Sequence, residues 1–548
     1  MRKTIAIAIV LVLVLTMLTG CGGNDTPSTN PPASSGTSVS PAAPLDPDTS
    51  VDTGSSAPPA GSVVRVGIAS DPNGLSPFAG RSGGMIATYR SIYEYLVDRN
   101  KFGGEMVGCL METYEKINDT TYNLKLYDYI YDTAGNHFTA SDVVFTMETM
   151  IETGNMPKLN QIVSVTALDE YTVQFVFTGA LPVGELEALW SENPMVTRAA
   201  YEASSDGMAT TPVGTTAYKV TQYATGSKIV LEYAGDYWQK NSSLMPFMAQ
   251  HNVETIEFHI ITEGAQRSIA LETNTVDLIG SIRSSDVGRF SDSGKFTTFN
   301  YMENPIYTLF FNGSDDNPLA SQALREAIAY GIDVQDLIDG AYNGNGYVAK
   351  TIGSPKYGDY VTAWDNESYF DFDLARAKSL MADAGYANGG LTLRLLCLNA
   401  EDVKTIATII QGSLLQLGID VVINALDNAM MNSLEKEPGE WDLYIKSQGS
   451  TDYLVNIWKS LFSEQSYGGT TVNFIKDAEL QSKLSLALTP EGHTSANVNA
   501  FHNHVKDNCY AMGMSTYYSY VVGNTLIQGV FLDSRNNIMP GACQYNFS

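Results

Sequence analysis

The segment Leu324-Arg325-Glu326-Ala327-Ile328-Ala329-Tyr330-Gly331-Ile332-Asp333 decides the architecture of this 548-residue chain. Its apolar side chains recur three or four positions apart, which is the spacing of one helix face. The same stripe continues outward and predicts a helix over residues 321–337. Asp371 precedes a second helical pattern that ends at Gly385, a residue type that commonly terminates helices.

The region that follows alternates strand and helix patterns. Residues 391–398 predict a strand, residues 403–417 a helix and residues 419–423 another strand. This order is a βαβ unit, which favours a parallel strand pair with a right-handed crossover. Residues 441–446 predict a further strand, so this half of the chain is predicted to be α/β.

The first half of the chain is richer in strand patterns. Apolar or alternating residues predict strands over residues 63–68, 171–177, 228–233 and 255–261. The whole chain is therefore predicted to be an α/β protein. At ~150 residues per domain, its length favours about three domains.

The N-terminus has the features of an export signal. Arg2 and Lys3 precede an uncharged apolar run over residues 5–18, which is short for a permanent membrane span. The run ends in Leu18-Thr19-Gly20-Cys21, which resembles a lipobox. Residues 1–20 are predicted to be a cleaved signal peptide and Cys21 to be lipidated. Such a lipoprotein would be anchored to the cell membrane on its outer, extracytoplasmic face.

The segment after Cys21 is rich in Ser, Thr, Pro, Gly, Ala and Asp, so residues 21–61 are predicted to be a disordered tether. The net charge is -28, which argues against nucleic acid as a partner. The remaining cysteines are far apart and form neither a zinc motif nor a disulfide framework, although one bridge stays open. These are Cys109, Cys397, Cys509 and Cys543.

Four segments carry a more specific pattern. They are His137-Phe138-Thr139-Ala140-Ser141-Asp142-Val143-Val144-Phe145, Val213-Gly214-Thr215-Thr216-Ala217-Tyr218-Lys219-Val220, Ala270-Leu271-Glu272-Thr273-Asn274-Thr275-Val276-Asp277, and Phe311-Asn312 with the helix stretch that opens at Leu324. Together they resemble the family 5 extracellular solute-binding proteins, the oligopeptide, dipeptide and nickel binding lipoproteins of ABC importers. One departure is Thr216-Ala217, where the family usually has Gly-Pro, and it puts the local turn in doubt.

The resemblance implies a two-lobed fold like that of periplasmic binding proteins, of the class II type, with three domains and a discontinuous first lobe. Lobe I would comprise residues 62–98, 210–300 and 512–548. An inserted domain would span residues 99–209, and lobe II residues 301–511. Such a protein captures short peptides and delivers them to the permease of an ABC importer by lobe closure.

A peptide site needs a carboxylate for the ligand ammonium and a cation for its carboxylate. The loop Gly449-Ser450-Thr451-Asp452-Tyr453 follows a predicted strand, and a similar loop in relatives implies that Asp452 meets the peptide amino group. The loop around Phe78 and Arg81 corresponds to a cleft-lining loop in relatives, and Arg81 is a candidate partner of the ligand carboxylate. Asn304 and Tyr307 stand where the chain is expected to cross between the lobes. A surface or core role remains open for each of these residues.

Other functions are weighed against peptide capture. An oligosaccharide-binding or signalling receptor of the same fold is the main alternative, because 31 tyrosines offer stacking surfaces. His502 and His504 are a weak candidate pair of metal ligands, because residues two positions apart do not share a helix face. No motif of a hydrolase, metalloprotease or nucleotide-binding enzyme occurs. The chain is therefore predicted to be a monomeric binding protein with no catalytic role, no cofactor and no metal.

Overall fold

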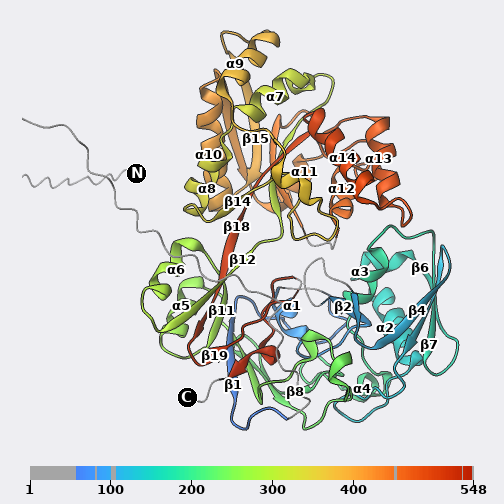
Figure 1. The fold of residues 1–548 in the computed structure, drawn as a ribbon. Coiled ribbons are helices and arrows are strands. Elements are labelled where there is room, and N and C mark those ends of the chain that lie inside the picture. The colour runs from blue at the N-terminus through green and yellow to red at the C-terminus, as the bar shows by residue number, and fades with distance from the viewer. Residues whose placement is uncertain (1–56, 81–82, 100–105, 450–452, 534, 546–548) are drawn as a thin grey trace, which may run out of the picture. The chain divides into compact units, whose positions relative to one another are not determined.

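The computed structural model describes residues 57–80, 83–99, 106–449, 453–533 and 535–545. Within these residues the chain is a mixed α/β protein (Figure 1). Its largest sheet has the strand order β16-β15-β17-β13-β18-β11-β1-β10-β9-β8, with β12 and β14 also paired to β18. No helix in the described part of the chain is both long and apolar enough to cross a membrane.

One half of this sheet comes from the first part of the chain. β1 runs parallel to β10 and β11, and the other neighbours are antiparallel. Its strands are β1 (Val63–Ile68), β8 (Tyr218–Ala224), β9 (Lys228–Tyr233), β10 (Thr255–Ile260), β11 (Leu278–Ile282) and β12 (Phe296–Met302), and the helices of this part are α1 (Gly83–Tyr89), α5 (Gly264–Glu272) and α6 (Ser284–Ser291). β2 (Val97–Arg99) lies outside this sheet, in a separate pair of strands. The strands predicted over residues 63–68, 228–233 and 255–261 are confirmed.

A separate antiparallel sheet, β4-β5-β7-β6, lies between β2 and β8 in the chain. The region comprises β3 (Met106–Gly108), β4 (Met111–Asn118), β5 (Thr121–Leu126), α2 (Ala140–Thr153), β6 (Ile162–Ala167), β7 (Thr172–Phe177), α3 (Glu185–Ser191) and α4 (Arg198–Ala203). The Thr139 backbone N–H donates to the Asp142 carboxylate at 2.7 Å, which caps the start of α2.

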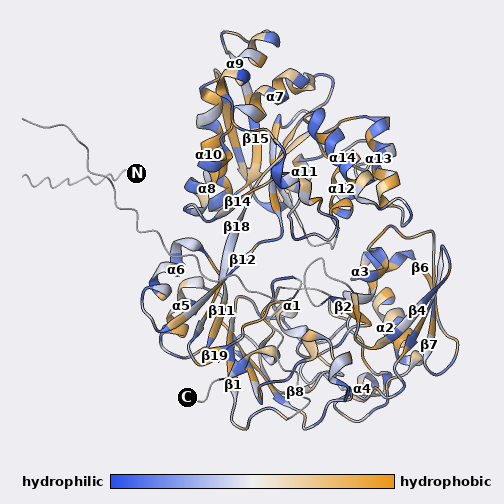
Figure 2. Cartoon of the chain, viewed as in Figure 1, coloured by the Kyte–Doolittle hydropathy of each residue, from blue (hydrophilic) through white to orange (hydrophobic). Residues whose placement is uncertain are grey.

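The other half of the large sheet carries helices on both faces. Its elements are β13 (Ile306–Phe311), α7 (Gln322–Tyr330), α8 (Val334–Tyr342), β14 (Gly346–Val348), α9 (Leu374–Asp383), β15 (Leu391–Leu398), α10 (Glu401–Leu415), β16 (Ile419–Leu426), α11 (Asn428–Leu434), β17 (Leu443–Gln448), α12 (Leu454–Phe462), α13 (Ala478–Leu488) and α14 (Ser495–Asp507). β15 and β16 are parallel, which confirms the predicted βαβ unit. Figure 2 shows that β15 is largely apolar, as expected for a strand covered on both faces.

The single helix predicted over residues 321–337 is wrong, because the chain forms α7 and α8 instead. α7 ends at Tyr330, and the Asp333 side chain accepts the Gln335 backbone N–H and starts α8. Ile332 between them is fully buried, so the apolar stripe continues although the helix does not. Apolar periodicity alone therefore misses a cap within the stripe.

β18 (Ala511–Asn524) joins the two halves of the sheet. Its first residues pair with β13 and β14, and its later residues pair with β11 and β12. The predicted domain boundary at Met512 therefore falls inside a continuous strand. Two short strands complete the chain, β19 (Ile527–Gln528) and β20 (Gln544–Tyr545).

Two buried clusters lie on opposite faces of the β13, β15 and β17 strands. Leu309 and Phe311 of β13 pack with α7 to α10, whereas Phe310 packs with α12 to α14. Successive strand residues point to opposite faces, so one strand supplies both clusters.

Candidate functional site

The link from β12 to β13, residues 303–305, is held against β18. The Glu303 backbone N–H donates to the Tyr517 carbonyl at 3.0 Å, and the Ser519 hydroxyl donates to the Glu303 carboxylate at 2.6 Å. We call this link the crossing segment, because the strands on its two sides belong to the two halves of the sheet. These hydrogen bonds hold the crossing segment in one position against β18.

Asn304, in the middle of the crossing segment, has an unsatisfied acceptor. The residue is only 9% exposed, and its side-chain oxygen has no hydrogen-bond partner among the described residues. Most buried polar atoms are paired, and an unpaired one costs about 1–3 kcal/mol. The Asn304 oxygen is therefore suited to accept an N–H group from a ligand, and its role as a site residue stays a prediction.

A half-buried cation, Lys356, lies beside the crossing segment. The Lys356 ammonium donates to the Met302 carbonyl at 3.0 Å and to the Asn536 side-chain oxygen at 2.8 Å. Burial lowers the pKa of Lys356 to about 8, although Glu303 and Asp533 oppose this shift. The group is charged at neutral pH and is suited to attract a carboxylate.

The sequence analysis missed Lys356. The residue follows a proline in a loop that has no helical or strand periodicity, so nothing in the local pattern marks it. Its position depends on contacts with Met302 and Asn536, which are 54 and 180 residues away. The only local signal is the cluster Pro355-Lys356-Tyr357-Gly358, which combines turn residues with a cation and an aromatic ring.

Further buried ion pairs lie in the loop between β19 and β20. Asp533 pairs with Arg90 at 3.0 Å, and Arg90 also forms an ion pair with Asp98. The next described residue, Arg535, donates to Glu192 at 3.3 Å. Buried charges are tolerated when they are paired, so this network fixes the loop that presents Asn536 to Lys356.

The loop with the predicted residues Ser450 and Asp452 lies outside the described residues, but its two ends are described. A Cβ atom on Gly449 would lie 3.2 Å from the Pro305 Cα atom, so glycine permits a close approach to the crossing segment. At the other end, the Arg99 guanidinium lies over the Tyr453 ring at 5.5 Å.

The start of α12, next to the same loop, is capped from a distant loop. The Asp359 carboxylate accepts the backbone N–H groups of Leu454 and Val455 at 2.6 and 3.2 Å. The His493 ring nitrogen lies 3.3 Å from the same carboxylate. These contacts fix the C-terminal end of the loop, so that Tyr453 enters α12 at a defined point.

Phe78 lies in the core. It is 6% exposed, and its ring contacts those of Tyr201 and Phe145 at centroid distances of 4.9 and 6.2 Å. Its carbonyl accepts a hydrogen bond from the Asn155 side chain at 3.0 Å. Arg81 and Cys21 lie outside the described residues. Phe78 thus anchors the loop that leads to Arg81.

Tyr307 faces away from α12. Its hydroxyl donates to the Asp402 carboxylate at 3.3 Å, and its side chain packs with the cluster under α7 to α10. Burial is the main cause that raises its pKa well above the usual value, and the Asp402 charge adds to it. The structure therefore places Asn304 and Gly449 near one another through Pro305, whereas Phe78 and Tyr307 contact different clusters.

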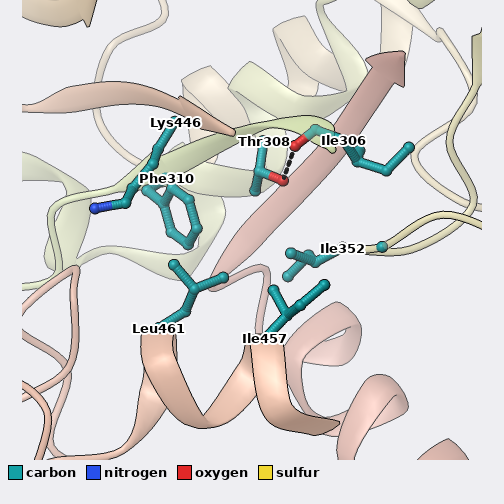
Figure 3. A pocket seen from close by; sticks show the side chains of 8 residues that line it. Ile306, Thr308, Phe310, Ile352, Lys446, Ile457 and Leu461 are labelled. Carbon is teal, nitrogen blue, oxygen red and sulfur yellow. Dashed lines mark hydrogen bonds between the residues drawn. The ribbon is translucent and has the colours of Figure 1, made fainter. Parts of the chain in front are cut away.

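The face of β13 toward α12 is closed. Figure 3 shows Leu461 of α12 pointing toward Phe310, and Ile457 of α12 pointing toward Ile352. The pocket among these side chains leaves no room for a water molecule. It is apolar packing, and we exclude it as a solute site.

The paired histidines of α14 do not converge. His502 is buried and stacks on Trp364 at 4.2 Å, and burial lowers its pKa to about 4. His504 instead contacts the Asp477 carboxylate at 2.7 Å. In the described ranges, no group of three or more His, Cys, Asp or Glu residues is arranged to hold a metal ion. The four cysteines named above are all buried, and none of them forms a disulfide.

Comparisons with known proteins agree with this architecture. Residues 105–464 match the model of the bacterial extracellular solute-binding proteins, family 5. The nickel-binding protein NikA of Staphylococcus aureus is 25% identical over 362 residues, which cover 64% of this chain and 69% of that protein.

Two solved structures share the fold. The ABC transporter substrate-binding protein CtaP of Listeria monocytogenes superposes with a TM-score of 0.75 and 19% identity, over 88% of this chain and 99% of that one. The dipeptide-binding protein of Pseudoalteromonas sp. SM9913, in complex with Met-Leu, has a TM-score of 0.67 and 16% identity, over 88% and 100%. The predicted two-lobed α/β fold is confirmed, and so is the prediction of a binding protein without catalytic activity.

Proposed function

Because the chain belongs to the bacterial extracellular solute-binding proteins of family 5, we propose that it captures short peptides outside the cytoplasm and delivers them to an ABC importer. The observation that carries this proposal is that a hydrogen-bond acceptor and a cation, which are complementary to a peptide, both lie at the crossing segment. The buried Asn304 oxygen lacks a partner among the described residues, and the Lys356 ammonium is bound to Met302, two residues before it.

These groups match the two polar parts of a peptide. A peptide N–H is a donor for the Asn304 oxygen, and the Lys356 charge attracts the terminal carboxylate. Asp452, in the loop between Gly449 and Tyr453, is proposed to receive the peptide ammonium. Ser450 and Gly449 would present backbone groups from the same loop, and Arg81 would add a second cation.

The closing motion is proposed to involve the crossing segment and β18, because both run between the two halves of the sheet. A ligand that contacts both halves favours the closed form by its differential affinity. The similarity to the Listeria monocytogenes ABC transporter protein supports the proposed delivery to a permease.

Native mass spectrometry of the protein, purified without unfolding from a rich host, tests the ligand class. We expect co-purified masses that correspond to two to six amino acids. A hexose series in their place would favour the oligosaccharide-binding alternative. A metal-sized mass increment would move the function toward that of the nickel-binding relative.

The role of Asp452 has its own test. Asp452→Ala is expected to weaken binding of peptides with a free amino group by about tenfold or more, because a charge-assisted hydrogen bond is lost. N-acetylated peptides should bind wild type and variant alike. Equal losses for both peptide forms would contradict the assignment.

We also propose that Cys21 carries the lipid and that the mature protein is a monomer. Phase separation in a mild detergent should place the wild-type protein in the detergent phase. Cys21→Ser should move it to the aqueous phase, while the mass of the soluble particle stays that of one chain. A variant that remains in the detergent phase would refute the anchor.

A further inference from the structure

A second polar space lies beside the strands that join the two halves of the sheet. It is a cavity of about 460 Å³, lined by residues of α6, α8, the first turn of α10 and β18. Figure 1 shows these helices near β18, beside β12 and β14. The cavity shares no lining residue with the crossing segment or with Lys356, so it is separate from the proposed peptide site.

Asp402 supplies a buried carboxylate to this cavity. The residue is 6% exposed, and its two contacts with described residues are long: the Tyr307 hydroxyl at 3.3 Å and the Arg283 guanidinium at 3.9 Å. Charge-assisted hydrogen bonds are normally about 2.7–2.9 Å long. Both contacts of the Asp402 carboxylate are longer than this, so the protein groups satisfy it incompletely.

Tyr342 provides the second observation. It lines the cavity and is 4% exposed. Its hydroxyl lies beside that of Ser515, and both are buried without a hydrogen bond of normal geometry to any described residue. The Tyr517 ring packs 5.3 Å from that of Tyr342. Tyr342 and Tyr517 therefore line the same cavity as the incompletely satisfied Asp402 carboxylate.

The charged residues that line the cavity indicate the charge of its ligand. Asp286, Glu401 and Asp402 oppose a single lining cation, Arg283. This excess of carboxylates disfavours an anionic ligand. A space of this volume with tyrosines in its lining suits an organic molecule, and ammonium groups are attracted to aromatic rings.

We propose that this cavity binds a small organic amine, whose ammonium group pairs with Asp402 and donates a hydrogen bond to the Tyr342 hydroxyl. The walls come from α6, which follows β11 in one half of the sheet, and from α8 and α10 of the other half. The amine would therefore favour one arrangement of these walls, and its binding would be thermodynamically linked to binding of the main solute.

Isothermal titration calorimetry on the full-length chain without peptide tests the site with 1,4-diaminobutane. We expect saturable binding with one molecule per chain and no binding of the uncharged analogue 1,4-butanediol. Asp402→Asn keeps the shape of the side chain and should weaken binding at least about tenfold. Asp420→Asn, an exposed carboxylate of β16 outside the cavity, should leave binding unchanged.

Tyr342→Phe is a second test that should leave the fold intact, because it removes only the hydroxyl. Its binding should fall by about threefold to tenfold with an unchanged circular dichroism spectrum. Absence of saturable diamine binding would overturn the proposal, and so would equal binding of the diol. Unchanged affinity in Asp402→Asn would also overturn it. None of these outcomes bears on peptide capture, because no peptide is present.

Discussion

The two faces of β13 differ in what they contact, although they belong to the same six residues. Ile306, Thr308 and Phe310 face α12, where the side chains leave no space for water. Tyr307 faces the other way and reaches the Asp402 carboxylate beside an open polar cavity. The face toward α12 is dry and filled, whereas the opposite face is apolar at Leu309 and Phe311 and reaches a charged group only at Tyr307.

This difference separates stability from binding within one strand. Apolar atoms removed from water stabilise the fold in proportion to their area, and they leave nothing for a ligand to recognise. Charged groups with long or missing contacts add little to stability, but a ligand can satisfy them. We therefore expect substitutions on the filled face to change unfolding, and those at the polar groups to change binding.

The largest effect is expected for Leu461→Ala on the filled face. Leu461 is 1% exposed and lines the closed pocket with Phe310. Removal of its side chain leaves a cavity, and it should lower the free energy of unfolding by about 2–5 kcal/mol. Denaturant titration followed by circular dichroism measures this change.

Leu486→Ala is the matched control, because Leu486 on α13 is 50% exposed. It should change the free energy of unfolding by less than about 1 kcal/mol. Similar losses in the two variants would mean that the pocket is looser than its packing indicates.

A change of pH tests the role of Lys356, which is bonded to Met302 just before the crossing segment. Its pKa of about 8 lies below the ordinary value of 10.5. Peptide affinity should therefore fall as the pH rises from 7 to 9.5, by about tenfold, because the attracting charge is lost. Titration calorimetry with one dipeptide at several pH values measures this effect.

The stability of the unliganded protein should change in the opposite direction. Between pH 8 and 10.5 the folded protein has released the Lys356 proton while the unfolded chain still holds it. Stability from this group therefore rises with pH in that window. Lys356→Met should remove both dependences, and a variant with the wild-type pH profile would exclude Lys356 as their cause.

Tyr307→Phe should have a smaller effect. It removes a single hydroxyl that donates to Asp402 at 3.3 Å, a long hydrogen bond. The expected loss in the free energy of unfolding is about 0.5–1.5 kcal/mol. Tyr131→Phe, on a 49% exposed ring, should cause no measurable loss. A loss above about 3 kcal/mol would show that Asp402 depends on this donor far more than its geometry indicates.

Much of the fold was predictable because its signals are local. The βαβ unit over residues 391–423 follows from periodicity within each element, and β15 and β16 confirm it. The division of the predicted helix into α7 and α8 was not predicted, because Asp333 acts as a cap inside an unbroken apolar stripe. The continuity of β18 across both halves of the sheet depends on pairing with strands more than 200 residues away.

The candidate site was less predictable. Asn304 was predicted as a site residue because it lies at an expected crossing, and its missing hydrogen-bond partner is visible only in three dimensions. Lys356 depends on contacts from two distant segments. Asp402 resembles an ordinary helix-start acid in the sequence, and only the cavity gives it another meaning. Residues that are brought together from distant parts of the sequence have no local sequence pattern from which their proximity could be predicted.

Thr308→Val is expected to have the smallest effect, and it completes the comparison within β13. Thr308 is 2% exposed on the filled face, and among the described residues its hydroxyl reaches only the Ile306 carbonyl, at 3.4 Å (Figure 3). Replacing this weakly bonded hydroxyl by a methyl group of similar size removes a desolvation cost, so the free energy of unfolding should stay within about 0.5 kcal/mol or rise slightly. Tyr307→Phe and Thr308→Val then remove one hydroxyl each from adjacent residues, with a loss expected only for Tyr307. Denaturant titration of both variants decides the matter, because equal losses would mean that the two faces of β13 do not differ in the way their contacts indicate.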